Sequence, residues 1–272
     1  MPIDLDAYFH RIGYAGERAA TLDTLRAINA LHPMAIAFEN LNPLLKWPVA
    51  LDAPSLEQKL VRSGRGGYCY EHNLLFSHVL KALGFQVREL AGRVVRHAAI
   101  VEMTPRTHIV LHVELDGRAY IADVGLGRCT LTSPLLLESN IEQPTPHGPF
   151  RLTKAGEEFV MEAKIGDKWT ALYRFDLQEQ FLTDYEVGNW YTSTHPKSPF
   201  VTDLMAARTD SGCRYTLRNN VLSVHRLSGL TERRKIGSAY DLHKTLEDVF
   251  RLTLPDTQEL GAILEGAIHR SA

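Results

Sequence analysis

Cys69 is a candidate nucleophile because of what surrounds it in the sequence. The segment reads RGGYCYE over residues 65–71. Two glycines permit a tight turn with backbone angles that other residues avoid, and a helix is expected to begin at or beside Cys69. A thiol at the amino end of a helix is favoured as thiolate by the helix dipole, and the free N–H groups there can stabilise an oxyanion. This segment alone leaves a buried, unreactive cysteine equally open.

A β-hairpin is predicted over residues 107–124. Its first strand, THIVLHVEL at residues 107–115, alternates strictly between two faces. Asp-Gly follows at 116–117, which is a strong signal for a two-residue turn. Pairing Leu115 with Arg118 across that turn fixes the register, and a slip by one residue would move every side chain to the opposite face.

This register makes His108 and Asp123 diagonal neighbours on one face of the hairpin. It places Val110 opposite Asp123 and His108 opposite Gly125, which is close enough for contact. A histidine oriented by an aspartate is the base half of a catalytic triad, because the carboxylate fixes the imidazole tautomer and the other ring nitrogen can take a thiol proton. His112 shares the face and is the alternative base, though farther from Asp123, and a hairpin with surface polar residues is the other alternative.

The elements that must position these residues change in type along the chain. The first third is helical: residues 22–31 carry leucine or isoleucine every three positions. Helix starts are expected at Asp4 or Asp6 and at Ser55, which has a capping-box pattern, and Gly84 is a natural stop for the helix that begins near Cys69.

The rest of the chain is β-rich and then mixed. Between Phe85 and about Phe175, at least five short runs with strand character are separated by turns and not by helices, which indicates an antiparallel sheet or barrel. These runs are 86–95, 107–115, 119–124, 159–165 and 169–173. A hairpin over 215–224 and two helices, near 241–251 and 256–268, close the chain. The sequence predicts an α+β protein with lobes at residues 1–84, 85–188 and 189–272.

Composition narrows the class of protein. Of 272 residues, 44% are hydrophobic and 23% charged, which is typical of a soluble globular chain, and the net charge of −2 argues against a general nucleic-acid binder. A signal peptide is not expected, because the first residues are acidic where a signal peptide is basic, and no run of about 18 apolar residues is found in the sequence. Three cysteines make a poor disulfide framework and fit a reducing cytosol. His72 and His78 are six apart, which suits no chelating pair, so no metal is expected.

At the residues of the candidate triad the chain resembles the arylamine N-acetyltransferase family, and its bacterial branch in particular. Matching segments run in family order over nearly the whole chain: AFENL at 37–41, RGGYCYE at 65–71, TH at 107–108, DVGLG at 123–127, TPHG at 145–148, and residues 189–200. The resemblance implies an N-terminal helical bundle, a central antiparallel β-barrel and a C-terminal α/β lid, which agrees with the three lobes. It also implies ping-pong transfer of an acetyl group from acetyl-CoA to arylamines, arylhydrazines or N-hydroxyarylamines.

The resemblance assigns a role to each residue of the candidate triad. Cys69 is implied to be the nucleophile, His108 the general base and acid, and Asp123 the orienting carboxylate of a cysteine-protease-like site. The cysteine and histidine are implied to rest as a thiolate–imidazolium pair, which makes the thiol reactive to alkylating agents. Glu39 and Arg65 are expected to form a structural charge pair that holds the nucleophile loop.

The resemblance also suggests how the substrates bind. Phe38, Leu126 and Phe200 would line an apolar slot for an aromatic acceptor, and Thr107 and Gly127 would contact the CoA arm; core packing is the alternative for each. Many relatives have Phe at the position of Leu126, so the slot is expected to be wider here. No Walker or dinucleotide loop is present. Acetyl-CoA is therefore expected as a co-substrate in a surface cleft, with no tightly bound cofactor.

Alternatives to acetyl transfer share the same triad. A thioesterase or protease differs in admitting water, and an amide synthase differs in taking a larger acyl chain; a non-catalytic binding protein is the third class. The expected protein is a cytoplasmic monomer or homodimer. Its expected partners are acetyl-CoA and small aromatic amines or hydrazines, with no nucleic acid and no membrane.

Overall fold

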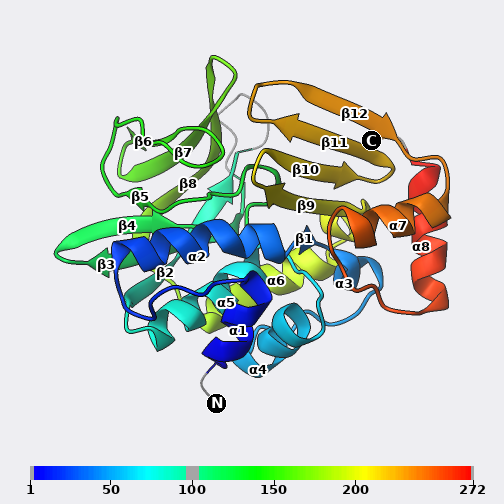
Figure 1. Cartoon of the computed structure of the whole chain (residues 1–272), viewed down its shortest axis with the longest axis horizontal. Helices are drawn as coiled ribbons and strands as arrows, with labels where there is room; N and C mark the ends of the chain where they lie inside the picture. The colour runs from blue at the N-terminus through cyan, green and yellow to red at the C-terminus, as the bar shows by residue number, and fades with distance from the viewer. Residues whose placement is uncertain (1–2, 96–103, 271–272) are drawn as a thin grey trace.

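The computed structural model describes residues 3–95 and 104–270. The N-terminal part is built of helices (Figure 1), and only a two-residue strand, β1 (Phe38–Glu39), interrupts them. The helical segments are α1 (Leu5–Ile12), α2 (Leu22–Ala35), α3 (Leu41–Leu44), α4 (Ala53–Leu56), the π-helical turn η1 (Glu57–Arg62) and α5 (Cys69–Ala82).

Local capping sets the ends of these helices. Asp4 caps α1, accepting a hydrogen bond from the backbone N–H of Ala7. The expectation that Ser55 is an N-cap is wrong: Asp52 caps α4 and accepts from the backbone N–H of Ser55 at 3.0 Å. Because α4 already begins at Ala53, Asp52 occupies the N-cap position and Ser55 becomes the capped residue. As predicted, α5 begins at Cys69, and Gly84 follows it in the left-handed region at φ 92°.

The middle of the chain forms a seven-stranded antiparallel sheet that curls into a nearly closed barrel (Figure 1). Two bridges bring the chain after β5 to β6, Ser139 with Leu152 and Gln143 with Phe150, and so nearly close the ring. The strands, in sheet order, are β5 (Leu135–Leu136), β4 (Arg118–Ala122), β3 (Arg106–Leu115), β2 (Gln86–Val94), β8 (Lys168–Glu179), β7 (Glu158–Ile165) and β6 (Phe150–Ala155).

The predicted hairpin register is confirmed. Strands β3 and β4 pair from Leu111 with Ala122 to Leu115 with Arg118. Asp116 and Gly117 both have positive φ, 51° and 72°, as a type I′ turn requires. The turn chemistry therefore fixes which face of the barrel each side chain of the hairpin occupies.

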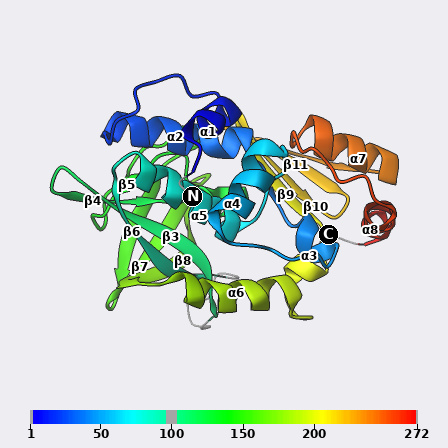
Figure 2. The same ribbon diagram turned by 90° about the horizontal axis from the view of Figure 1, so that it is seen from below.

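A second antiparallel sheet forms the C-terminal part, and it borrows β1 from the N-terminal part. Phe38 pairs with Ala207 and Glu39 with Ala206. The order is β1-β9-β10-β11-β12, with β9 (Met205–Asp210), β10 (Cys213–Arg218), β11 (Val221–Arg226) and β12 (Thr231–Lys235). Helices α7 (Ala239–Asp248) and α8 (Gln258–Ile268) pack at its end, while α6 (Leu182–Thr194) runs from the barrel toward α3 (Figure 2).

The largest core cluster joins α5 to the barrel. Leu75, Phe76 and Val79 of α5 and Ile109 and Leu111 of β3 are all fully buried within it. Burying each such side chain contributes about 1.5–3 kcal/mol, so the packing of α5 on β3 is strongly fixed. In the described part of the chain no helix has the length and apolar character needed to span a bilayer.

Candidate active site

The nucleophile candidate lies at the first position of α5, with only 5% of its surface exposed. Gly66 and Gly67 are needed before it because the chain is crowded there. A Cβ on Gly66 would lie 2.0 Å from the carbonyl oxygen of Ala37, and one on Gly67 would lie 2.6 Å from a Glu71 oxygen. Neither glycine has positive φ, so close approach and not an unusual backbone angle explains the two glycines, contrary to the expectation from sequence.

His108 and Asp123 meet as the hairpin register predicts. The Nε2–H of His108 donates to Asp123 Oδ2 at 2.7 Å, and both side chains are 1% exposed. The Nδ1 atom of His108 is thereby left free of Asp123, and Cys69 is close enough to the imidazole to help raise its pKa. The alternative base, His112, lies 3.4 Å from Arg88 instead. The structure thus brings Cys69, His108 and Asp123 together and directs His112 elsewhere.

The electrostatics of the pair favour an imidazolium beside a carboxylate. Burial lowers the pKa of His108, but the charge of Asp123 and its hydrogen bond, together with Cys69, outweigh burial and raise that pKa to about 10. Burial likewise raises the pKa of Asp123, yet His108, Asn73 and the backbone N–H of Gly125 bring it below its usual value. His108 therefore carries its proton throughout the neutral pH range.

Asn73 is a site residue that the sequence reasoning missed. Its Nδ2 donates to Asp123 Oδ1 at 2.9 Å, and its Oδ1 accepts from the backbone N–H of Val124 at 2.9 Å. The side chain is fully buried. Asn73 lies four residues after Cys69, on the same face of α5, and this spacing was the available signal. The helix that carries the thiol thus also holds the carboxylate.

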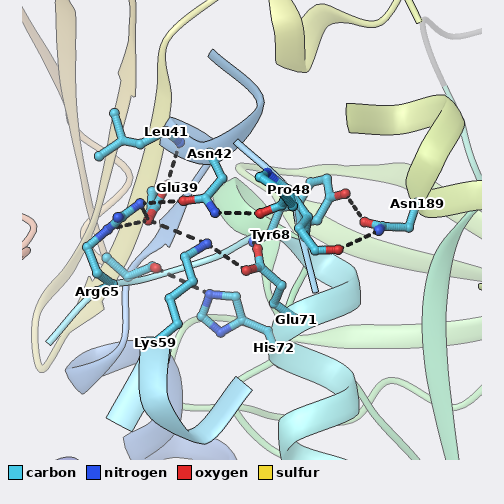
Figure 3. A network of polar contacts seen from close by, with 12 residues as sticks. Glu39, Leu41, Asn42, Pro48, Lys59, Arg65, Tyr68, Glu71, His72 and Asn189 are labelled. Carbon is cyan, nitrogen blue, oxygen red and sulfur yellow. Dashed lines mark hydrogen bonds and ion pairs between the residues drawn. The ribbon is translucent and has the colours of Figure 1, made fainter. Parts of the chain in front are cut away.

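A buried charge network supports the nucleophile loop (Figure 3). Arg65 donates to Glu39 at 2.7 Å, which confirms the expected charge pair. Beside it, Lys59 donates to Glu71 at 2.6 Å, and Glu71 also accepts from the backbone N–H of Tyr68 at 3.0 Å, forming half of a capping box for α5. The Lys59–Glu71 pair was not predicted, because nothing in the sequence links these two helical segments.

Four of the five predicted substrate contacts line one cavity of about 470 Å³: Phe38, Leu126, Gly127 and Phe200. The ring of Phe200 lies 6.1 Å from that of Phe38. Thr107 is outside this lining, and its carbonyl oxygen accepts from the thiol of Cys69 at 3.4 Å.

A residue next to the lining of this cavity lies close to the nucleophile, and two arginines give the cavity positive charge. Gly125, which precedes the lining residues, is so close to the nucleophile that a Cβ on it would lie 2.9 Å from Cys69 Cα. Arg128 and Arg233 also line the cavity, and neither has an ion-pair partner among residues 3–95 and 104–270. In the same residues no group of three or more His, Cys, Asp or Glu side chains is placed to hold a metal.

The structure therefore places a thiol at a helix start near an imidazole held by a buried carboxylate, on a fold of helices, barrel and second sheet. A family model described as N-acetyltransferase matches residues 21–259. The arylamine N-acetyltransferase of Mycolicibacterium smegmatis is 46% identical over 261 residues, 94% of each chain. The Salmonella typhimurium arylamine N-acetyltransferase / N-hydroxyarylamine O-acetyltransferase is 36% identical over 268 residues, 96% of this chain and 95% of that one.

Solved structures agree with the sequence relatives. The Mycobacterium marinum arylamine N-acetyltransferase in complex with CoA superposes with a TM-score of 0.91 at 42% identity, covering 97% of this chain and 98% of that one. The chain belongs to the arylamine N-acetyltransferase family. The family resemblance read from the sequence is confirmed, as is the predicted α+β fold of helical bundle, antiparallel barrel and C-terminal α/β part, which the structure shows as a second sheet with helices α7 and α8.

Proposed function

We propose that the protein transfers an acetyl group from acetyl-CoA to the nitrogen, or oxygen, of aromatic amines, hydrazines and N-hydroxyarylamines through an acetyl-Cys69 intermediate. The observation that carries the proposal is the placement of Cys69 at the amino end of α5 beside the His108–Asp123 pair. The relative solved with CoA and the relative named for O-acetyl transfer support the donor and the acceptors.

In the first half-reaction the Cys69 thiolate attacks the thioester carbonyl carbon of acetyl-CoA. The carbon–sulfur bond to CoA breaks, and the His108 imidazolium gives its Nδ1 proton to the departing CoA thiolate. The backbone N–H of Cys69, at the first position of α5, has no intrahelical acceptor and is available to stabilise the developing oxyanion. The product is a thioester on Cys69.

In the second half-reaction the acceptor nitrogen attacks that thioester. His108, now neutral, takes a proton from the attacking amine at Nδ1, and the bond from the acetyl carbon to Cys69 Sγ breaks to restore the thiolate and the imidazolium. Asp123 stabilises the imidazolium and keeps the Nε2–H tautomer in the neutral state. Asn73 holds Asp123 in this orientation.

The cavity beside Gly125 supplies both binding functions. Phe38, Leu126 and Phe200 give the apolar slot for the aromatic ring of the acceptor. Thr107, whose carbonyl contacts the reacting sulfur, and Gly127, in the lining of the cavity, are the residues expected to contact the pantetheine end of CoA. Arg128 and Arg233 are the cations of the cavity that suit the phosphates of CoA.

Further expectations from the sequence remain proposals. Acetyl-CoA acts as a co-substrate with no tightly bound cofactor, and the protein works in the cytoplasm as a monomer or homodimer, where Cys69 stays reduced. The boundaries at residues 84/85 and 188/189 also stay predictions.

Intact-mass measurement tests the proposal. Mixing with acetyl-CoA should add one acetyl group, an arylamine should remove it as acetylated amine, and Cys69→Ala should take up none. Acetylation of Cys69→Ala at the wild-type rate would refute the role of Cys69. Rapid acetyl-CoA consumption without any amine would favour a thioesterase, because water would then compete with the acceptor.

A further inference from the structure

Three buried side chains beneath the cavity form a hydrogen-bonded chain that the proposed mechanism does not use. The hydroxyl of Tyr8 lies 2.8 Å from His32 Nδ1, and His32 Nε2 lies 2.8 Å from His72 Nδ1. His72 Nε2 then lies 3.2 Å from the carbonyl oxygen of Ala37. Tyr8 and His32 are 0% exposed and His72 is 1% exposed.

The carbonyl oxygen of Ala37, the last acceptor of this series, determines which ring nitrogen of each histidine carries the proton. Burial lowers the pKa of His72 to about 4 and that of His32 well below its ordinary value, so both imidazoles are neutral and each carries one N–H. A carbonyl oxygen can only accept, so His72 holds its proton on Nε2 and accepts at Nδ1. His32 must therefore donate from Nε2 and accept the Tyr8 hydroxyl proton at Nδ1.

His72, the last side chain of this hydrogen-bonded series, contacts a residue of the acceptor slot. The ring of Phe38 stacks on His72 with an interplanar angle of 8° and a centroid distance of 6.3 Å. Ala37, whose carbonyl accepts from His72, is the residue before Phe38, so His72 contacts this short strand through both its backbone and its ring. Phe38 in turn lines the cavity opposite Phe200.

The loop before Cys69 shares the Ala37 carbonyl with His72, because the backbone N–H of Gly67 also donates to it at 3.4 Å, but a shorter contact holds the loop independently. The backbone N–H of Glu39 donates to the carbonyl of Gly67 at 2.7 Å, which ties the loop before Cys69 to β1 without His72. Asn73 holds Asp123, which in turn holds His108, and neither contact involves His72. A disturbance at His72 should therefore reach Phe38 more than the reacting sulfur.

We propose that His72 is a positioning residue for acceptor binding: its orientation, set by His32 and Tyr8, holds Phe38 in the slot for the aromatic ring. This inference rests on the proposed function, because it assigns Phe38 to the acceptor. It predicts a division between the half-reactions, in which acylation by acetyl-CoA is preserved and acceptor KM rises.

The first test is direct observation of the imidazole tautomers by 15N NMR of histidine-labelled wild-type protein at pH 7. Both His32 and His72 should be neutral with the proton on Nε2. Tyr8→Phe keeps the ring but removes the hydroxyl donor to His32 Nδ1; because His72 still needs a donor at its Nδ1, the proton of His32 should stay on Nε2 and only the Nδ1 chemical shift should change. Observation of His72 as imidazolium, or with its proton on Nδ1, would overturn the assignment.

Kinetics of the two half-reactions form the second test. His72→Leu should raise the arylamine KM about three- to tenfold, the effect of one buried hydrogen bond, and leave the acylation rate within twofold. His72→Gln, which can still donate to Ala37, should recover part of the loss. His78→Gln, a half-buried histidine elsewhere on α5, is the matched control and should change neither step.

The kinetic outcomes separate the two proposals. Equal losses in both half-reactions, or an unchanged acceptor KM in folded His72→Leu, would assign His72 to stability alone and refute the inference. If His72→Leu does not fold, Tyr8→Phe supplies the same comparison. Failure of the wild-type protein to take up an acetyl group would instead refute the proposed function. The tautomer measurement does not depend on acetyl transfer and would still test the proton positions of His32 and His72.

Discussion

Replacing Asp123 by Asn is the sharpest perturbation of the site, since it removes one charge and almost no volume. The carboxylate accepts the Nε2–H of His108 in a fully buried setting. An Asn amide can donate to Nε2, which would place the imidazole proton on Nδ1, where it faces the thiol and can no longer accept its proton. Asp123→Asn should therefore leave the fold intact and disable the base.

The size of the effect follows from the pKa of His108. A value of about 10, against an ordinary 6.5, corresponds to about 5 kcal/mol in favour of the imidazolium. Without the carboxylate, only Cys69 opposes burial, which lowers the pKa of His108, so His108 should become neutral at pH 7 and the thiolate should lose its partner. Because the reactive form of a cysteine is the thiolate, alkylation of Cys69 at pH 7 should slow by about tenfold or more. Acylation should slow by about 10³–10⁴.

Alkylation with iodoacetamide between pH 6 and 10, followed by mass, measures the first effect, and stopped-flow acylation by acetyl-CoA measures the second. The wild-type alkylation rate should be flat up to about pH 9, because His108 stays protonated below its raised pKa. The variant rate should rise with pH. Glu114→Gln, a half-exposed acid on the same hairpin, is the control. A flat profile and acylation within tenfold of wild type in Asp123→Asn would refute the reasoning.

Three further substitutions test other parts of the site. Gly125→Ala brings a methyl group to 2.9 Å from Cys69 Cα and should lower acylation at least 100-fold in stopped-flow assays, with retained far-UV circular dichroism. Arg65→Met leaves a buried carboxylate without its main partner and should cost about 3–5 kcal/mol in urea unfolding, whereas Arg62→Met at an exposed pair should cost under about 1 kcal/mol. Leu126→Phe narrows the acceptor slot and should change KM among arylamines of different size, with unchanged acylation by acetyl-CoA.

The register of the β3–β4 hairpin is the part of the structure that the sequence predicted in most detail, from its turn residues and its alternating pattern. Asp116 and Gly117 select a two-residue turn, and strict alternation then permits one register, so the contact of His108 with Asp123 followed from local information. The start of α5 at Cys69 was local too. The choice of Asp52 over Ser55 as N-cap was not predictable by pattern, because both residues offer an acceptor and the competition depends on where the chain enters the helix.

Long-range polar pairs were beyond the reach of sequence. Lys59 meets Glu71, and His32 meets His72 forty residues away, only because η1, α2 and α5 pack together. A single histidine in a helix is equally compatible with a solvated surface, a packed core or a ligand. Asn73 is intermediate, since its spacing from Cys69 places it on the correct face, while its partner depends on the docking of α5 against the barrel.

The two-residue strand β1 has a consequence for the order in which the protein is assembled during synthesis. Phe38 and Glu39 form sheet partners with Ala207 and Ala206, about 170 residues later in the chain. At about 5–20 residues per second, the ribosome needs on the order of ten to thirty seconds to supply that partner strand. Until then the edge of β1 is unpaired and Phe38 lacks its neighbour Phe200. The slot beside Cys69 is therefore completed late, so the nascent chain carries its nucleophile well before it has a finished acceptor site.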